Sequence, residues 1–341
     1  TGTYYAAGIA AYNNSSSGSY KHLVNKGNHT FVGECGTNFY FGGIAGNTMV
    51  TTSPLDGNEY AMENSGTLTF ESTATVGGIA YIGGCTGTAT NGGKTGLHNT
   101  GAITVLGTVG TELYVGGNVG SASSTNSKLV NSGIINVGGT CGAAFAVAGC
   151  VAYSTQNVNN LTNSGNVTVE TVSTYELAER AYMVGGAVGH IEATSSAMRT
   201  INNITNRGNV TYNATSTASA ANIRIGGGVA SGTYTNVNDI ENTGKIVFGE
   251  NANALATCEV SIAGGMGWIY YGTLKNSVNG DAKDTTFEKG MVSLESPNKV
   301  FTYYAGGCDG YVRTYGHNNT DGSFNHNTHS NYGKIRTTAN F

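Results

Sequence analysis

The chain has 341 residues, and its 16 Lys and Arg against 20 Asp and Glu give a formal net charge of −4. With only 11% charged residues it carries no basic stripe of the kind that binds nucleic acid. It also lacks the run of about 18 apolar residues that would span a membrane. Glycine is abundant, at 53 residues, and proline is rare, at two, which is typical of stacked β structure rather than of a disordered chain.

A glycine motif returns nine times from one end of the chain to the other. Each copy reads apolar, Gly or Ala, Gly, any residue, then a small or apolar residue, as in Val115–Val119. The key glycines are Gly8, Gly43, Gly78, Gly117, Gly149, Gly186, Gly227, Gly264 and Gly306, with spacings of 32 to 42 residues. Paired small residues allow a strand to bend or another backbone to approach, so this motif predicts a tight bend. The residue two positions after each key glycine, such as Val119 or Cys308, is expected to point inward.

A second motif, Asn-x-Gly, alternates with the first and also occurs nine times. Its copies are Asn25 and Gly27, Asn64 and Gly66, Asn99 and Gly101, Asn131 and Gly133, Asn163 and Gly165, Asn206 and Gly208, Asn242 and Gly244, a distorted copy at Asn276–Gly280, and Asn331 and Gly333. The glycine supplies a bend that a residue with a Cβ resists. We expect the asparagines to satisfy backbone groups at that bend and to hydrogen-bond to one another as a ladder between turns.

A short strand follows each Asn-x-Gly. Leu68 and Phe70 flank Thr69, Ile103 and Val105 flank Thr104, and the later copies alternate in the same way. Period-2 alternation predicts a strand with one buried face. Such strands at a fixed repeat predict an all-β fold, a right-handed parallel β-helix of about nine repeats of 32–42 residues with about three short strands per turn.

The repeat runs through the whole chain, so a single β-solenoid domain over residues 1–341 is expected. Residues 1–20 form a worn N-terminal turn and a loop, and residues 266–341 form the most divergent turns. Divergent terminal repeats commonly cap a solenoid or carry its binding surface. Because Thr1 lies inside a repeat, we expect a processed mature form or a fragment.

The two motifs together resemble GLUG-type repeats, as in Phe41-Gly42-Gly43-Ile44-Ala45 followed by Asn64-Ser65-Gly66. The resemblance covers nearly the whole chain, although the gaps between motifs are longer and more irregular than in that family. GLUG repeats occur in secreted and surface proteins of Bacteroidetes and in the stalks of some peptidases and adhesins. The resemblance therefore implies an extracellular or cell-surface location and an accessory, non-enzymatic role.

The six cysteines are expected to be mostly free and buried. Cys35 and Cys141 fall on one ladder, three turns apart, which is too far for a disulfide. Cys308 takes an inward position, and Cys150 lies next to the equivalent inward position of its own repeat, so both are expected to be small buried residues. A Cys141–Cys150 disulfide remains the alternative. No Cys-x-x-Cys pattern occurs, so no zinc site and no cofactor are predicted.

An aromatic set gathers on consecutive turns near the C-terminus. It comprises Trp268, Tyr270, Tyr271, Tyr303, Tyr304, Tyr311 and Tyr315. Aromatic rings either seal the end of a β core or offer a platform for sugars. Sealing is the preferred interpretation, and Trp268, Tyr270, Tyr271, Tyr311 and Tyr315 remain the candidates for glycan contact.

Two chemical alternatives find less support. His317, His326 and His329 with Asp309 and Asp321 could ligate a metal, but their spacing fits no standard motif and a surface loop is preferred. Enzymes on β-helices need paired acids on one wall, and no two aspartates occupy equivalent positions of adjacent repeats, so no catalytic residue is assigned.

The sequence thus predicts a non-enzymatic extracellular rod that displays loops or a binding surface to glycans or proteins, with neither nucleic acid nor a membrane span. One alternative is a structural subunit that associates end to end into a filament through unpaired strand edges. The other is a polysaccharide-active β-helix enzyme.

Overall fold

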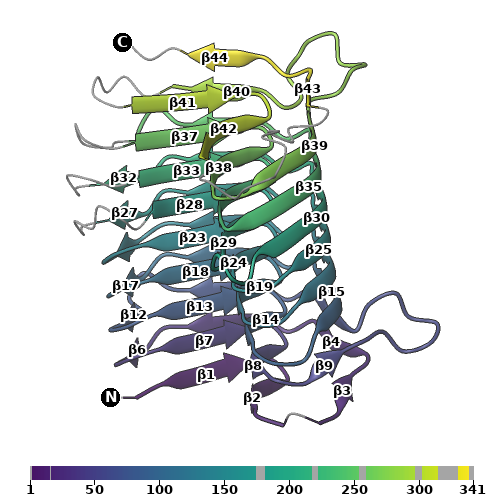
Figure 1. The fold of residues 1–341 in the computed structure, drawn as a ribbon. Coiled ribbons are helices and arrows are strands. Elements are labelled where there is room, and N and C mark those ends of the chain that lie inside the picture. Colours follow the sequence, from purple (N-terminus) through teal and green to yellow (C-terminus); the bar gives the residue numbers. More distant parts are fainter. Residues whose placement is uncertain are drawn as a thin grey trace.

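In a computed structural model the chain coils into a stack of parallel strands (Figure 1). The structure describes residues 2–15, 17–173, 181–216, 222–252, 259–295, 302–313 and 329–337. Within these ranges every regular element is a strand, and the strands form five parallel sheets, which we name A to E.

Sheets A and B contain nine strands each. Sheet A consists of β1 (Tyr4–Ala7), β7 (Phe39–Gly42), β13 (Ala80–Gly83), β18 (Leu113–Gly116), β23 (Phe145–Ala148), β28 (Ala181–Gly185), β33 (Asn222–Gly226), β37 (Glu259–Ala263) and β41 (Thr302–Gly306). Sheet B consists of β2 (Ala10–Asn13), β8 (Ala45–Thr48), β14 (Thr86–Ala89), β19 (Val119–Ala122), β24 (Val151–Ser154), β29 (Val188–Glu192), β34 (Val229–Thr233), β38 (Met266–Tyr270) and β42 (Asp309–Arg313).

Sheets C, D and E complete each turn. Sheet C consists of β3 (Ser19–Tyr20), β4 (Leu23–Asn25), β9 (Thr51–Thr52), β10 (Met62–Asn64), β15 (Lys94–Asn99), β20 (Asn126–Asn131), β25 (Val158–Asn163), β30 (Arg199–Asn206), β35 (Thr235–Asn242), β39 (Thr273–Asn279) and β43 (Ser330–Asn331). Sheet D consists of β5 (His29–Phe31), β11 (Leu68–Phe70), β16 (Ile103–Val105), β21 (Ile135–Val137), β26 (Val167–Val169), β31 (Val210–Tyr212), β36 (Ile246–Phe248), β40 (Val292–Leu294) and β44 (Ile335–Thr337). Sheet E consists of β6 (Glu34–Cys35), β12 (Thr75–Val76), β17 (Thr108–Val109), β22 (Thr140–Cys141), β27 (Val172–Ser173) and β32 (Thr215–Ser216).

The chain is therefore a parallel β-helix of nine turns, as predicted. The expected alternation in sheet D is confirmed, since Leu68 and Phe70 are buried while Thr69 between them is partly exposed. The expectation of three strands per turn was wrong. Most turns have five, because each bend at the key glycine separates two strands, of sheets A and B, and short two-residue strands form sheet E.

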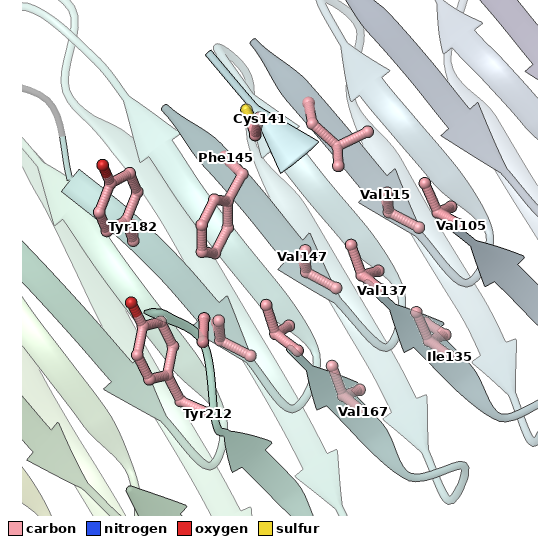
Figure 2. Close-up of a cluster of buried hydrophobic side chains, with 14 of the residues drawn as sticks. Val105, Val115, Ile135, Val137, Cys141, Phe145, Val147, Val167, Tyr182 and Tyr212 are labelled. Carbon is pink, nitrogen blue, oxygen red and sulfur yellow. The ribbon is translucent and has the colours of Figure 1, made fainter. Parts of the chain in front are cut away.

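The interior of the coil holds two separate hydrophobic cores. The larger lies between sheets A, D and E, and Figure 2 shows part of it, with Phe145, Tyr182 and Tyr212 side by side. The ring centroids of Phe145 and Tyr182 are 4.7 Å apart. The smaller core lies between sheets B and C and contains Leu97, Leu129 and Leu161 from successive turns. Stacking each turn on the next buries the apolar face that no single turn could bury alone.

The recurring asparagines form a continuous ladder where sheet C ends. In each turn the carboxamide Nδ2 donates to the Oδ1 of the asparagine of the next turn, at 2.7–2.9 Å. The ladder joins Asn25, Asn64, Asn99, Asn131, Asn163, Asn206, Asn242, Asn279 and Asn331. The same nitrogens also donate to the carbonyl of the following glycine, such as Gly133 for Asn131, at 2.9 Å. The predicted ladder of Asn64, Asn99, Asn131, Asn163, Asn206 and Asn242 is thus present.

In the distorted copy of the Asn-x-Gly motif, the asparagine that joins the ladder is not the expected one. The ladder residue of that turn is Asn279, whose Nδ2 donates to the carbonyl of Gly290 because residues 281–289 are inserted before it. Asn276 belongs to a separate column of left-handed residues in sheet C, with φ of 52°. The column contains Gly96, Lys128, Asn160, Asn203, Asp239 and Asn276, and Gly, Asn and Asp are the residues that adopt this conformation most readily.

Two copies of the glycine motif were placed in the wrong register. In the third turn the equivalent of Gly43 is Gly84 and not Gly78, because the amide of Gly43 donates to the carbonyl of Gly84 and β13 begins only at Ala80. In the last turn Ala263 pairs with Gly306, so the key glycine is Gly307. The other inward positions that we predicted, such as Val119 and Met266, are buried.

Because the key glycine of the last turn is Gly307, Cys308 directly follows it, as Cys85 follows Gly84 and Cys150 follows Gly149. Cys35, Cys85, Cys141, Cys150 and Cys308 are all buried free thiols, so the structure contains no Cys141–Cys150 disulfide. Cys35 and Cys141 share one ladder, with Val76 and Val109 between them, as predicted. Cys258 lies outside the described residues.

Candidate functional site: a groove between sheets A and B

A groove runs along the outside of the coil where sheets A and B meet. Gly87 and Gly120, on β14 and β19, bring the two sheets close together, because a Cβ on either would lie within 3 Å of backbone atoms of sheet A. The side chains that point away from both cores on the two sheets therefore converge from opposite sides. They form two columns, one on each sheet.

The two columns are complementary in size. The column on sheet A is Tyr5, Tyr40, Tyr81, Tyr114, Ala146, Met183, Arg224, Ser261 and Tyr304. The column on sheet B is Tyr12, Asn47, Thr88, Ser121, Tyr153, His190, Ser231, Trp268 and Tyr311. In six of the nine turns a large side chain on one sheet faces a small one on the other, for example Tyr114 with Ser121 and Ser261 with Trp268. The larger group thus changes sheets along the rod.

The aromatic rings stack on one another along the groove. Ring centroids are 4.6 Å apart for Tyr5 and Tyr40, 5.0 Å for Tyr40 and Tyr81, and 5.4 Å for Tyr81 and Tyr114, with interplanar angles of 10–15°. Tyr153 continues the column at 5.2 Å from Tyr114. Since each face covers the next ring, the column presents ring edges and hydroxyl groups to the groove instead of open faces.

Of the aromatic residues proposed for glycan contact, Trp268 and Tyr311 belong to the sheet B column of this groove, and Tyr270 and Tyr271 lie beside them. Trp268 is 9% exposed, and the Arg224 guanidinium lies 3.6 Å from its ring centroid. Tyr270 and Tyr311 stack beside Trp268, with centroids 5.2 and 6.3 Å away. Tyr271 packs edge-on against Tyr270, at 4.0 Å. The faces of Trp268 are therefore covered by Arg224 and by neighbouring tyrosines, in the groove outside both hydrophobic cores. Tyr315 lies outside the described residues.

A cavity of about 350 Å³ opens in the groove where the aromatic column is interrupted. Its lining is Glu112, Tyr114, Ala144, Tyr153, Met183, His190, Glu192, Arg224, Thr233 and Trp268. At the column position of these turns stand Ala146 and Met183, which leave the space that a tyrosine ring fills in the preceding turns. The volume falls in the range of about 300–1,000 Å³ that is typical of small-molecule sites.

Two tyrosine–glutamate pairs line this cavity. The Tyr114 hydroxyl donates to Glu112 Oε2 at 2.8 Å, and the Tyr153 hydroxyl donates to Glu192 Oε2 at 2.5 Å. Burial raises the pKa of both hydroxyls, and the negative charge of Glu192 raises it further. Both tyrosines therefore stay protonated and hold the two carboxylates at the cavity wall as hydrogen-bond acceptors.

Arg224 and His190 complete the wall with opposite protonation behaviour. Burial lowers the pKa of Arg224 to about 10, so its guanidinium is charged at neutral pH, and its Nη1 donates to Ser231 Oγ at 3.0 Å. Burial, followed by the charge of Arg224, lowers the pKa of His190 to about 3, so the imidazole is neutral. Its Nδ1 has no hydrogen-bond partner among the described residues. Among the described residues, the lining thus brings together the carboxyl groups of Glu112 and Glu192 and the guanidinium group of Arg224.

Most of this site lies outside the set predicted from sequence. Of the predicted candidates within the described residues, Trp268 alone lines the cavity. Tyr40, Tyr81 and Tyr114 each stand directly before the apolar-Gly-Gly triplet, and that spacing is the sequence signal that could have revealed the column. The search for paired acids considered aspartates at equivalent repeat positions. It missed Glu112, which directly precedes β18, and Glu192, which ends β29 two turns later, although both line one cavity.

The predicted metal candidate falls largely on His317, Asp321 and His326, which are outside the described residues. In the described ranges no group of three or more His, Cys, Asp or Glu is placed to hold a metal ion.

The comparisons with known proteins give no relative. No family model matches the chain, and neither the curated proteins nor the solved structures contain a match. The resemblance to GLUG-type repeats stays a prediction. Across the described ranges, none of the elements is a helix long and apolar enough to cross a membrane.

Proposed function

We propose that the chain is a non-enzymatic, rod-like binding module that holds a glycan in the groove between sheets A and B, outside the cell. The cavity at Glu112, Glu192, Arg224 and Trp268 carries this proposal. Its wall offers charged and polar groups to the hydroxyls of a sugar, next to aromatic edges, and a straight groove suits an extended chain of sugar units.

The shape of the site argues for edge-on contact. Because Arg224 covers Trp268, a sugar ring does not gain an open stacking platform at this tryptophan. Its contacts are instead hydrogen bonds to the acids and to the tyrosine hydroxyls, with the rod supplying rigidity. A preorganised wall reduces the ordering that binding would otherwise require.

A blocking variant tests the proposal. Thr233 lines the cavity from β34, so Thr233→Phe fills part of it, whereas Thr205→Phe places the same ring on sheet C, away from the groove. On an array of immobilised oligosaccharides, the wild type and Thr205→Phe should retain the same glycans, and Thr233→Phe should retain them at least about tenfold more weakly. Equal glycan retention by the two variants would show that glycans do not bind in this cavity.

A polysaccharide-active enzyme is the second candidate, because Glu112 and Glu192 line one cavity and acid pairs perform glycoside hydrolysis. It predicts that a bound glycan is cleaved and that Glu192→Gln abolishes the release of reducing ends. The binding module predicts that bound glycans are recovered intact.

A further inference from the structure

The tyrosine column of sheet A has a regular period on the N-terminal side of the cavity. Tyr40, Tyr81 and Tyr114 occupy three successive turns, with ring centroids 5.0 and 5.4 Å apart. All three side chains are partly exposed. Their spacing follows the distance of about 4.8 Å between neighbouring strands, so the backbone of the coil fixes it. The groove therefore offers the same phenol group once per turn.

The side chains opposite these tyrosines are buried. Asn47 and Thr88, which face Tyr40 and Tyr81 from sheet B, are 9% and 5% exposed. A ligand in this part of the groove therefore meets the edges and hydroxyl groups of the tyrosines rather than the side chains of sheet B. A phenol hydroxyl both donates and accepts hydrogen bonds, as the hydroxyl groups of a sugar do.

The cavity connects with this column at one end. Its volume of about 350 Å³ is near the lower limit of the range typical of small-molecule sites, so a ligand longer than a few sugar units must extend beyond it. On the C-terminal side, Arg224 and Ser261 take the column position on sheet A, and the Arg224 guanidinium covers the ring of Trp268. On the N-terminal side, Tyr114 both lines the cavity and stacks on Tyr81. The repeated phenol groups thus lie where a longer chain would leave the cavity.

We infer that the groove binds one strand of an unbranched, extended polysaccharide parallel to the rod, with one sugar unit per turn over Tyr114, Tyr81 and Tyr40. This inference rests on the proposed glycan-binding function, and it adds sugar subsites at Tyr81 and Tyr40 to the cavity. The spacing of the tyrosines is close to the length of one sugar unit in a fully extended β-linked chain. A backbone that coils, such as that of amylose, does not keep this register.

The test compares oligosaccharides of three and six sugar units. Cellulose, chitin, xylan and mannan oligomers have extended backbones, whereas amylose oligomers coil. For at least one extended series, calorimetry should show that the hexamer binds at least about tenfold more tightly than the trimer, because only the hexamer reaches Tyr81 and Tyr40 from the cavity. The amylose hexamer should bind no more tightly than the amylose trimer.

Single substitutions then assign the additional affinity to the tyrosine column. Tyr81→Phe keeps the stacked ring and removes only its hydroxyl group, so it should weaken binding of the hexamer about threefold to tenfold and leave binding of the trimer unchanged. Tyr332→Phe removes the same group from an exposed tyrosine between β43 and β44, and it should change neither affinity. The melting temperature checks that both variants keep the fold.

The outcomes separate the extended binding mode from the glycan site itself. Equal affinities for trimer and hexamer, both weakened by Thr233→Phe, would confine the ligand to the cavity and overturn the subsites at Tyr81 and Tyr40. A gain from trimer to hexamer in the amylose series as large as in the extended series would overturn the register of one unit per turn. The same would follow if Tyr81→Phe and Tyr332→Phe weakened hexamer binding equally. Binding of none of the five series, nor of any glycan on the array, would overturn both the extended mode and the glycan site.

Discussion

Gly117 and Asn131 touch across the interior of one turn: a Cβ built on Gly117 would lie 2.5 Å from Cγ of Asn131. The same contact joins Gly43 to Asn64 and Gly227 to Asn242. The two motifs of the repeat are thus halves of one structural unit, which explains why they occur equally often. The contact between the glycine and the asparagine lies between the two hydrophobic cores and separates them in each turn.

Gly117→Ala should be strongly destabilising. The added methyl group would overlap both the Asn131 carboxamide and the carbonyl oxygen of Gly149 in the next turn, and backbone atoms of a stacked sheet cannot move away. We expect a loss of about 1–3 kcal/mol in the free energy of unfolding. Urea denaturation measures it, and Gly57→Ala serves as a partial control, since a Cβ there meets nothing within 4 Å although its φ of 87° adds some strain. A smaller loss at Gly117 than at Gly57 would contradict the account.

Asn131→Ala should break the ladder at its centre. Nδ2 of Asn99 would lose its acceptor, and Oδ1 of Asn163 and the carbonyl of Gly133 would lose their donor, all in a buried environment. Each unsatisfied group costs about 1–3 kcal/mol, so the unfolding midpoint should fall steeply. Asn136→Ala, on the exposed face of the neighbouring sheet D, should change stability by less than about 0.5 kcal/mol. Similar losses in the two variants would show that the ladder has no special role.

The buried thiols should not react with alkylating reagents while the chain is folded. Burial raises the pKa of Cys85 to about 12 and that of Cys141 to about 11, and it raises the pKa of Cys150 as well. Because the thiolate is the reactive form, alkylating reagents at pH about 8 should label these residues only after denaturation. Peptide mass spectrometry with and without urea reads this out, and rapid labelling of native Cys85 or Cys150 would contradict their placement in the core.

Lys94 should make stability depend on pH in an unusual direction. Its side chain is buried, Nζ donates to the carbonyls of Asn91 and Gly92 at 2.7 and 2.6 Å, and desolvation lowers its pKa to about 8. The unfolded chain keeps the ordinary lysine pKa of about 10.4. Between about pH 8 and pH 10.4 the unfolded state therefore binds more protons, so this residue's contribution to stability rises with pH.

The tyrosines and thiols with raised pKa values act in the opposite sense over the same range, so the comparison must be made between variants. We expect the unfolding free energy of the wild type, relative to that of Lys94→Met, to increase from pH 7.5 to pH 10. A difference that stays constant or declines would show that Lys94 is not held with a depressed pKa.

Most of the fold could be predicted from sequence because its signals are local and repeated. The Asn-x-Gly bend and the alternation of Leu68 with Phe70 are recognisable without knowing what packs against them. The register of the third turn could not be predicted in this way. Gly77 and Gly78 allow close approach to the carbonyls of Gly36 and Thr37, so a second glycine pair with its own packing reason imitates the motif at Gly83 and Gly84.

The candidate site was harder to predict because it depends on contacts between sheets. Glu112, just before β18, and Glu192, at the end of β29, are two turns apart, and nothing in the repeat pattern brings them to one cavity. The role of Trp268 likewise depends on Arg224, which lies in the preceding turn and covers its face. Neither the Glu112–Glu192 pair nor the Arg224–Trp268 contact recurs with the repeat, so the repeat pattern does not predict them.

The most direct test of glycan binding in the groove uses Trp268, which is the only tryptophan of the chain and lines the cavity. Its fluorescence should be followed while chitosan, chitin and cellulose oligomers are titrated into the wild type and into Thr233→Phe. We predict a saturable change for at least one oligomer in the wild type, and a change at least about tenfold weaker in affinity in Thr233→Phe. Unchanged emission with every oligomer, or identical curves for the two proteins, would contradict binding in this cavity.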